Sequence, residues 1–152
     1  MSADAVFRFC NSVALAGWVL LVVTGWSAHA SRIISSLITG LLVPALLSGV
    51  YLALIAMYWG GHRGGFESLS NVMLLFTDRW LVLAGWVHYL AFDLFIGSWQ
   101  VRDARRNGVT FWLVAPCLVL TFLFGPIGLL LYLVSAGVVS RGKAWPGHPA
   151  AV

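Results

Sequence analysis

Four long stretches of this sequence carry no charged residue apart from Asp93, and they decide what the chain can fold into. Each stretch is 18 to 29 residues long. About 20 apolar residues in a helix cross a bilayer, because a helix rises about 1.5 Å per residue and the hydrocarbon core is about 30 Å thick. Runs without alternation are not the strands of a membrane β-barrel. The sequence therefore predicts an all-α integral membrane protein, a four-helix bundle in one domain. We place its spans at about 5–26, 34–59, 80–101 and 111–139.

The composition supports this fold class and excludes several functions. Hydrophobic residues make up 61% of the chain and charged residues 9%, which is too apolar for a soluble domain of this size. The net charge is +4, but the basic residues form no long basic run, so no nucleic-acid partner is expected. Two cysteines and four scattered histidines are too few for an iron–sulfur cluster or a histidine-rich iron site. We expect no metal and no cofactor.

The only long connector lies between the second and third stretches. Its apolar residues recur at helical spacing with polar residues between them, and they are Phe66, Leu69, Met73 and Phe76. This pattern predicts a short helix over 66–76 that lies on the membrane surface, and an irregular loop among the headgroups is the alternative.

A repeated string suggests how the bundle is built. Leu-Ala-Gly-Trp-Val occurs at 15–19 and again at 83–87, which favours two duplicated helical hairpins. An even number of spans would place both termini on the same side of the membrane. The first stretch also resembles a secretory signal, but it is longer than the apolar part of such signals, so we expect it to be retained.

Asp93 is the most informative residue of the chain. An ionisable side chain in a spanning helix costs at least about 2.5–3.5 kcal/mol on insertion scales, so we expect it to face the bundle interior. At 100° per residue, one stripe of aromatic and polar residues runs along the same side of this helix. The stripe consists of Trp86, Tyr89, Gly97 and Gln100. A carboxylate there could donate or accept a proton; the alternative is a hydrogen-bonded anchor to Asn11, to Tyr51 or to a backbone carbonyl.

Two other helical faces hold candidate residues. His88 precedes Asp93 by five residues, about 140° around a helix, so the two do not share a face. A catalytic role for His88 competes with simple packing among aromatic rings. On the first helix Asn11, Trp18 and Gly25 recur every seven residues, which suits either ligand binding or close helix packing.

Prolines interrupt two of the stretches. Gly125 and Pro126 break the hydrogen-bond ladder of the fourth stretch, and Pro44 breaks that of the second. Such breaks often surround a cavity, although they also occur as plain bends. The rings of Trp18 and Trp86 could line a slot for a long conjugated or isoprenoid ligand, and an aromatic core is the alternative.

A motif in the third stretch resembles a known family. From Trp86 to Phe95 the sequence is Trp-Val-His-Tyr-Leu-Ala-Phe-Asp-Leu-Phe, and Gly-Pro-Ile-Gly follows at 125–128. With these motifs the chain resembles the abscisic-acid-deficient-four-like family, whose plant member is the neoxanthin synthase of plastids. The resemblance implies a four-helix membrane protein of xanthophyll metabolism, in which an epoxide is opened and rearranged to an allene without net redox change. Asp93 would protonate the epoxide oxygen, and His88 or Tyr89 would assist.

These observations give one leading prediction and two alternatives. The leading prediction is a protein that binds or isomerises a carotenoid- or isoprenoid-type lipid, and any catalysis would be acid–base isomerisation of a xanthophyll-like substrate. The alternatives are a non-enzymatic subunit of a membrane or pigment complex and a minimal proton-coupled carrier. The candidate catalytic residues are Asp93, His88 and Tyr89. The candidate ligand-binding residues are Trp86, Trp18, Asn11, Gln100, Gly125 and Pro126.

The expected surroundings follow from the same reasoning. No Ser- and Arg-rich transit segment precedes the first stretch, so we expect a multi-pass protein of a bacterial inner membrane. The expected partners are the lipid bilayer, a hydrophobic pigment or isoprenoid ligand, and further subunits in a homo- or hetero-oligomer.

Overall fold

Helices form every regular element of the described chain, as the sequence predicts. The computed structural model describes residues 2–61 and 63–143. Its elements in chain order are α1 (Ala3–Thr24), α2 (Ala28–Ile33), the π-helix η1 (Ile34–Leu42), α3 (Val43–Tyr58), the short 3-10 helix η2 (Trp59–Gly61), α4 (Leu69–Leu75), α5 (Arg79–Asn107), α6 (Phe111–Phe124) and α7 (Pro126–Lys143).

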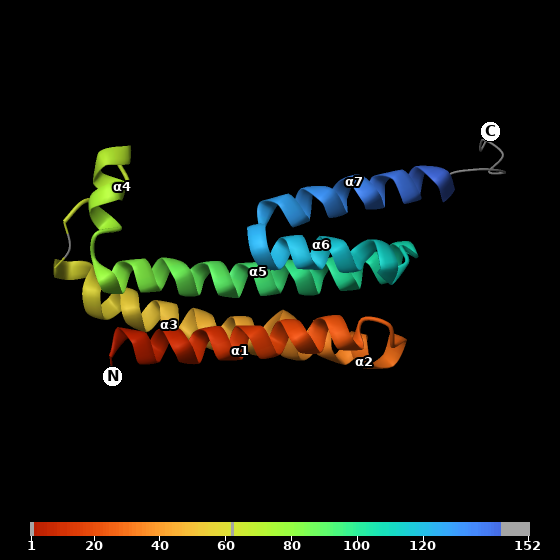
Figure 1. Ribbon diagram of the computed structural model, residues 1–152, viewed down its shortest axis with the longest axis horizontal. Helices are drawn as coiled ribbons and strands as arrows, with labels where there is room; N and C mark the ends of the chain where they lie inside the picture. Colours follow the sequence, from red (N-terminus) through yellow and green to blue (C-terminus); the bar gives the residue numbers. More distant parts are fainter. Residues whose placement is uncertain (1, 62, 144–152) are drawn as a thin grey trace, which may run out of the picture.

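Among the described residues, three helical segments are long and apolar enough to cross a membrane. They are α1, the continuous run Ala28–Gly61 from α2 to η2, and α5. The three extend along the long axis of the molecule, as Figure 1 shows. Half of the most apolar window of α5 is buried, compared with 28% for each of the other two, because α1, α3, η1 and α6 all pack against α5. α5 is therefore the central helix.

Capping groups fix where α1 and α5 begin and where α5 ends. The Ser2 side chain accepts a hydrogen bond from the backbone of Ala5, and the Asp78 carboxylate accepts two from the first turn of α5. Gly108 ends α5 in the left-handed conformation, with φ of 63°. At the start of both helices, Arg79 of α5 forms an ion pair with Asp4 of α1 at 2.8 Å.

The predicted fourth span is not confirmed, because the stretch 111–139 folds back on itself. α6 ends at Phe124, Gly125 takes a positive φ of 35°, and α7 begins at Pro126. α6 and α7 pack against each other as a hairpin, and Figure 1 shows its turn alongside the middle of α5. An L-residue with a side chain disfavours positive φ, and proline has no amide hydrogen to continue a helix, so this pair of residues suits a turn. The count of four spanning helices is not confirmed.

This hairpin changes the expected topology. α1 begins at one end of the molecule, whereas α7 ends at the other end, beside the start of α6 (Figure 1). Within the described residues, the start of α1 and the end of α7 thus lie at opposite ends of the molecule, which does not support the prediction that both termini share one side. The two proposed hairpins also differ from each other. After α1, the run from α2 to η2 returns over the length of the molecule, whereas after α5 the helix α6 ends alongside the middle of α5.

Two further predictions concern the connector helix and the helix at Pro44. A helix forms within the predicted range 66–76 as the shorter α4, which begins after Ser68, whose side chain accepts a hydrogen bond from Asn71 N at 3.2 Å. The place of this helix on the membrane surface stays a prediction. At Pro44 the helix continues without a break, but it passes through the π-helix η1 just before the proline. Val43 N bonds to the carbonyl of Ile38, five residues back.

Candidate functional site

Asp93 lies against the turn of the α6–α7 hairpin. A methyl group on Gly125 would lie 2.8 Å from Oδ1 of Asp93, so the carboxylate contacts the backbone of the turn directly. Oδ2 is buried and has no hydrogen-bond partner among the described residues. The side chain faces neighbouring helices, as expected for an ionisable group in a spanning segment.

The turn gives this carboxylate a favourable electrostatic setting. α7 begins at Pro126, so the first turn of the helix follows directly from the residue that Asp93 contacts. The N-terminal end of a helix carries a partial positive charge, which stabilises a nearby anion, and the effect is larger away from water. The hairpin thus places a helix N-terminus next to the only acidic residue of the four apolar stretches.

Tyr89 lies beside Asp93, one turn earlier on α5. Its hydroxyl donates a hydrogen bond to the carbonyl of Phe122 in α6, at 2.9 Å. This bond fixes the ring between α5 and the hairpin. The candidate catalytic pair of Asp93 and Tyr89 is therefore brought together by the structure, and the predicted stripe of α5 faces α1 and α6.

Trp86 extends this stripe toward the N-terminal end of the molecule. Its indole nitrogen donates to the side-chain oxygen of Asn11 in α1, at 3.2 Å. The ring centres of Trp86 and Tyr89 are 5.4 Å apart, and those of Trp86 and Phe7 are 5.9 Å apart. Trp86 remains 41% exposed, so its ring borders the surrounding lipid. The hydrogen bond between Trp86 and Asn11 thus links the candidate residues of α5 to those of α1.

Trp18 and Gln100 lie deeper, where they hold helices together. Trp18 is 5% exposed, and its ring lies on Gly97, where a side chain would overlap it. Gln100 is fully buried and exchanges hydrogen bonds with the hydroxyl of Thr121 in α6, at 3.0 and 3.2 Å. Neither residue contacts open space, so ligand binding by them stays a prediction.

His88 lies on another face of α5, away from Asp93. Its ring stacks on Phe92 at 4.5 Å and contacts Tyr51 of α3 at 5.5 Å. Tyr51, a sequence candidate to anchor Asp93, thus belongs to the His88 side. The structure does not unite the three candidate catalytic residues, so the catalytic role considered for His88 needs a test separate from that of Asp93.

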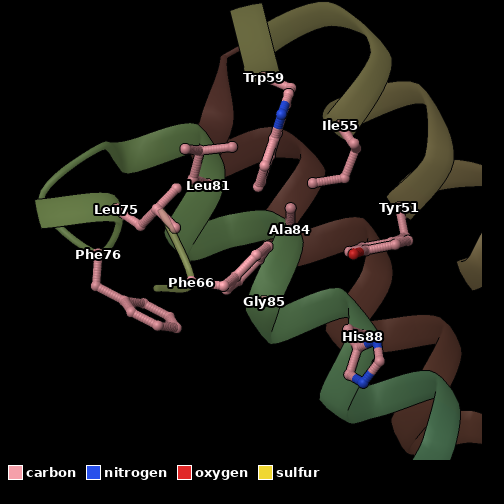
Figure 2. A pocket seen from close by; sticks show the side chains of 10 residues that line it. All are labelled: Tyr51, Ile55, Trp59, Phe66, Leu75, Phe76, Leu81, Ala84, Gly85 and His88. Carbon is pink, nitrogen blue, oxygen red and sulfur yellow. The ribbon is translucent and has the colours of Figure 1, made fainter. Parts of the chain in front are cut away.

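A pocket of about 290 Å³ opens beside His88, between α3, α4 and α5. Figure 2 shows the side chains that line it, with His88 and Tyr51 at one end and α4 at the other. Phe66 and Trp59 stack in its wall with ring centres 5.5 Å apart. Sequence reasoning missed this pocket, because the spacing of apolar residues predicts α4 but not the helix against which α4 packs.

The described residues contain no cluster suited to a metal ion. Within 2–61 and 63–143, no three His, Cys, Asp or Glu side chains gather in a suitable arrangement. Beside the α6–α7 turn the structure brings together a carboxyl group, a phenol and aromatic rings.

Comparison with known proteins identifies the family. The model of the ABA4-like family, described as ABA DEFICIENT 4-like, matches residues 5–132. The chain belongs to this family. The match extends from α1 into α7 and includes Asp93, Tyr89 and the turn at Gly125, so the resemblance found in the sequence is confirmed. Membership indicates a membrane protein related to carotenoids or xanthophylls. Neither a curated protein nor a solved structure matches the chain.

Proposed function

We propose that this protein binds a carotenoid- or isoprenoid-type lipid and isomerises it by acid–base chemistry at Asp93, within a bacterial inner membrane. One observation carries the proposal. Oδ2 of Asp93 is buried without a hydrogen-bond partner in the described part of the chain, at the turn of the α6–α7 hairpin and at the end of a row of aromatic rings. Burying such a group unpaired costs free energy, and groups of this kind occur preferentially at functional sites.

The aromatic row would hold the ligand. Phe7 and Trp86 are 43% and 41% exposed, and their rings form a row with that of Tyr89, one turn before Asp93. Flat rings suit a conjugated chain or a cyclic end group, because both bury apolar area and stack. A ligand dissolved in the membrane would reach this row laterally from the lipid.

The proposed reaction needs one group that gives and takes a proton. The protonated Asp93 carboxyl donates its proton to the epoxide oxygen as the carbon–oxygen bond breaks. The carboxylate then accepts the proton that leaves carbon as the new double bond of the allene forms. The acid is regenerated and no electrons are gained or lost, so the step is an isomerisation. Tyr89, held by the Phe122 carbonyl, would pack its ring against the ligand beside Asp93.

Mass spectrometry of pigment and lipid extracts tests the proposal. Extracts of cells with and without the gene are compared, and the gene is supplied as wild type, as Asp93→Asn or as Asp4→Asn. Asp4 is an exposed carboxylate at the helix start, so it serves as the control. We expect the wild type and Asp4→Asn to yield an isomer of equal mass that Asp93→Asn does not. Identical extracts with and without the gene would refute the enzymatic proposal.

A proton-coupled carrier is the second candidate, and the hairpin favours it. Transporters commonly place the N-terminus of a broken helix near the membrane midplane, close to their substrate. The start of α7 beside Asp93 has this form. Proton uptake into vesicles that contain the wild type but not Asp93→Asn, with unchanged extracts, would support a carrier. Unchanged extracts without proton uptake, together with a protein partner retained in mild detergent, would indicate a subunit of a membrane complex.

A further inference from the structure

A second polar site lies where the spanning helices end. At the end of the molecule opposite to the N-terminus, the last turns of α5 meet α2 and η1 around a pocket of about 580 Å³. Its lining includes four arginines and two serines, and no acidic residue is among the described residues that line it. These residues are Arg32, Arg102, Arg105, Arg106, Ser35 and Ser36.

Two of the arginines are held in place by backbone carbonyls. Arg105 donates to the carbonyl of Gly25 at 2.6 Å and to that of Ser27 at 3.0 Å, where α1 has ended and α2 is about to begin. Arg102 donates to the backbone carbonyl of Ser35 in η1. These bonds fix two guanidinium groups before any ligand arrives, which lowers the entropy cost of binding.

The π-helix η1 contacts Arg102 at a glycine. In η1 each backbone N–H donates to the carbonyl five residues earlier, whereas in an α-helix it donates to the carbonyl four residues earlier. Gly40 lies against the guanidinium of Arg102, and a side chain there would overlap it. Thr39 also accepts a hydrogen bond from Ser98 of α5 at 2.7 Å, so η1 is fastened to α5 beside the pocket. The packing of η1 against α5 thus forms the pocket wall.

The other two arginines have no opposing charge. Arg32 and Arg106 are exposed and form no ion pair within the described part of the chain. The nearest acidic residue in sequence, Asp103, accepts hydrogen bonds from Tyr132 of α7 at 2.6 Å and from Asn107 at 2.9 Å. Arg106 also repels Arg102 electrostatically. An anion in the pocket would relieve this repulsion.

We propose that this pocket binds a phosphate group, supplied by the headgroup of an anionic phospholipid. Arginine pairs with phosphate oxygens through two parallel hydrogen bonds, and serine hydroxyls add further donors. Basic pockets between spanning helices at the membrane surface are suited to anionic headgroups. A soluble phosphate anion shares this chemistry, so the experiment below separates the two sources. The site is independent of Asp93.

Lipid binding by the purified full-length protein tests the proposal. Native mass spectrometry in detergent compares phosphatidylglycerol with phosphatidylcholine of the same acyl chains. We expect phosphatidylglycerol to bind more tightly, and the double variant Arg32→Gln/Arg106→Gln to weaken it roughly 30-fold, because each arginine near an anionic headgroup contributes about fivefold. The matched control is Arg8→Gln/Arg63→Gln, which removes two exposed arginines near the other end of the molecule.

The outcomes are distinguishable. The altered arginines form none of the hydrogen bonds that fasten η1 and α1, so we expect the unfolding temperature of the double variant to match that of the wild type. Equal binding of the two lipids, or equal loss in both double variants, would overturn the proposal.

Inorganic phosphate is then added as a competitor. If it displaces phosphatidylglycerol at millimolar concentration, the site serves a soluble phosphate; if it does not, the lipid is the ligand. Asp93→Asn should bind phosphatidylglycerol as the wild type does, whatever the outcome for isomerisation.

Discussion

Gly125 is the residue on which the site depends most. Its φ of 35° is a conformation that residues with side chains rarely adopt, and a Cβ there would crowd Oδ1 of Asp93 at 2.8 Å. Gly125 also has ψ of −88°, and such a sparsely populated backbone conformation costs a residue with a side chain about 1–3 kcal/mol, so we expect Gly125→Ala to lower the free energy of unfolding by about that amount. Denaturant unfolding in detergent measures the change. Gly137→Ala is the control, because nothing lies within 4 Å of its added Cβ; equal loss in both variants would contradict the role of the turn.

Asp93 and His88 lie on different faces of α5, so we predict different outcomes for their variants. The ring of His88 packs on Phe92 and Tyr51, and neither of these contacts involves the Asp93 carboxylate or the α6–α7 turn. We therefore expect Asp93→Asn to abolish formation of the isomer, whereas His88→Ala keeps at least half of the wild-type yield. Extracts of cells expressing each variant at matched protein levels measure both. Loss of product in His88→Ala at normal protein level would show that the chemistry involves the other face.

The residues of these faces were predictable because a regular helix has fixed geometry. Spacing along the sequence placed Trp86, Tyr89 and Asp93 on one stripe, and the structure confirms that this stripe faces neighbouring helices. The partners were not predictable in the same way. The Phe122 carbonyl reaches Tyr89 only because α6 ends and turns nearby, and no pattern within α5 carries that information.

At the scale of elements, the α6–α7 hairpin is where sequence reasoning fails. A straight span and a hairpin that turns inside the membrane both need an apolar stretch, so hydropathy does not separate them. The difference lies in local geometry: Gly125 adopts a positive φ, and Gly128 lies against the backbone of Thr121, where a side chain would overlap it. The same reasoning explains η1, because a π-helix and an α-helix bury the same residue types and differ in their hydrogen bonds.

The hairpin predicts a labelling pattern that a straight span does not. Trp112, near the start of α6, and Val138, near the end of α7, are 73% and 67% exposed. In the hairpin both lie toward the same end of the molecule, so we expect single cysteines at these positions to react with a membrane-impermeant maleimide from the same side. The native cysteines are buried and serve as an unreactive background. Reaction from opposite sides, in intact spheroplasts and in inverted vesicles, would contradict the hairpin.

At the scale of the whole molecule, the hairpin also changes the balance of charge between the two ends. Three of the nine Lys and Arg residues, Arg8, Arg63 and Arg79, belong to the end that holds the N-terminus. The other six belong to the opposite end, because α7 carries Arg141 and Lys143 there. If the fourth span were straight, Arg141 and Lys143 would belong to the end that holds the N-terminus. That end would then have five basic residues and the opposite end four, which gives no clear orientation. Positive residues in short loops favour the cytoplasmic side, so the folded-back chain predicts that the arginine pocket faces the cytoplasm.

This orientation can be measured with reporter fusions. We expect green fluorescent protein fused after the last residue to fluoresce, because it folds in the cytoplasm, and alkaline phosphatase fused there to be inactive. Alkaline phosphatase inserted after Gly65, in the connector before α4, should be active on the opposite side. The cytoplasmic leaflet carries the anionic lipids that attract basic segments, so the same orientation would place the arginine pocket beside its proposed ligand. The reverse activities would turn that pocket away from the cytoplasmic leaflet and would leave soluble phosphate as the better source of the anion.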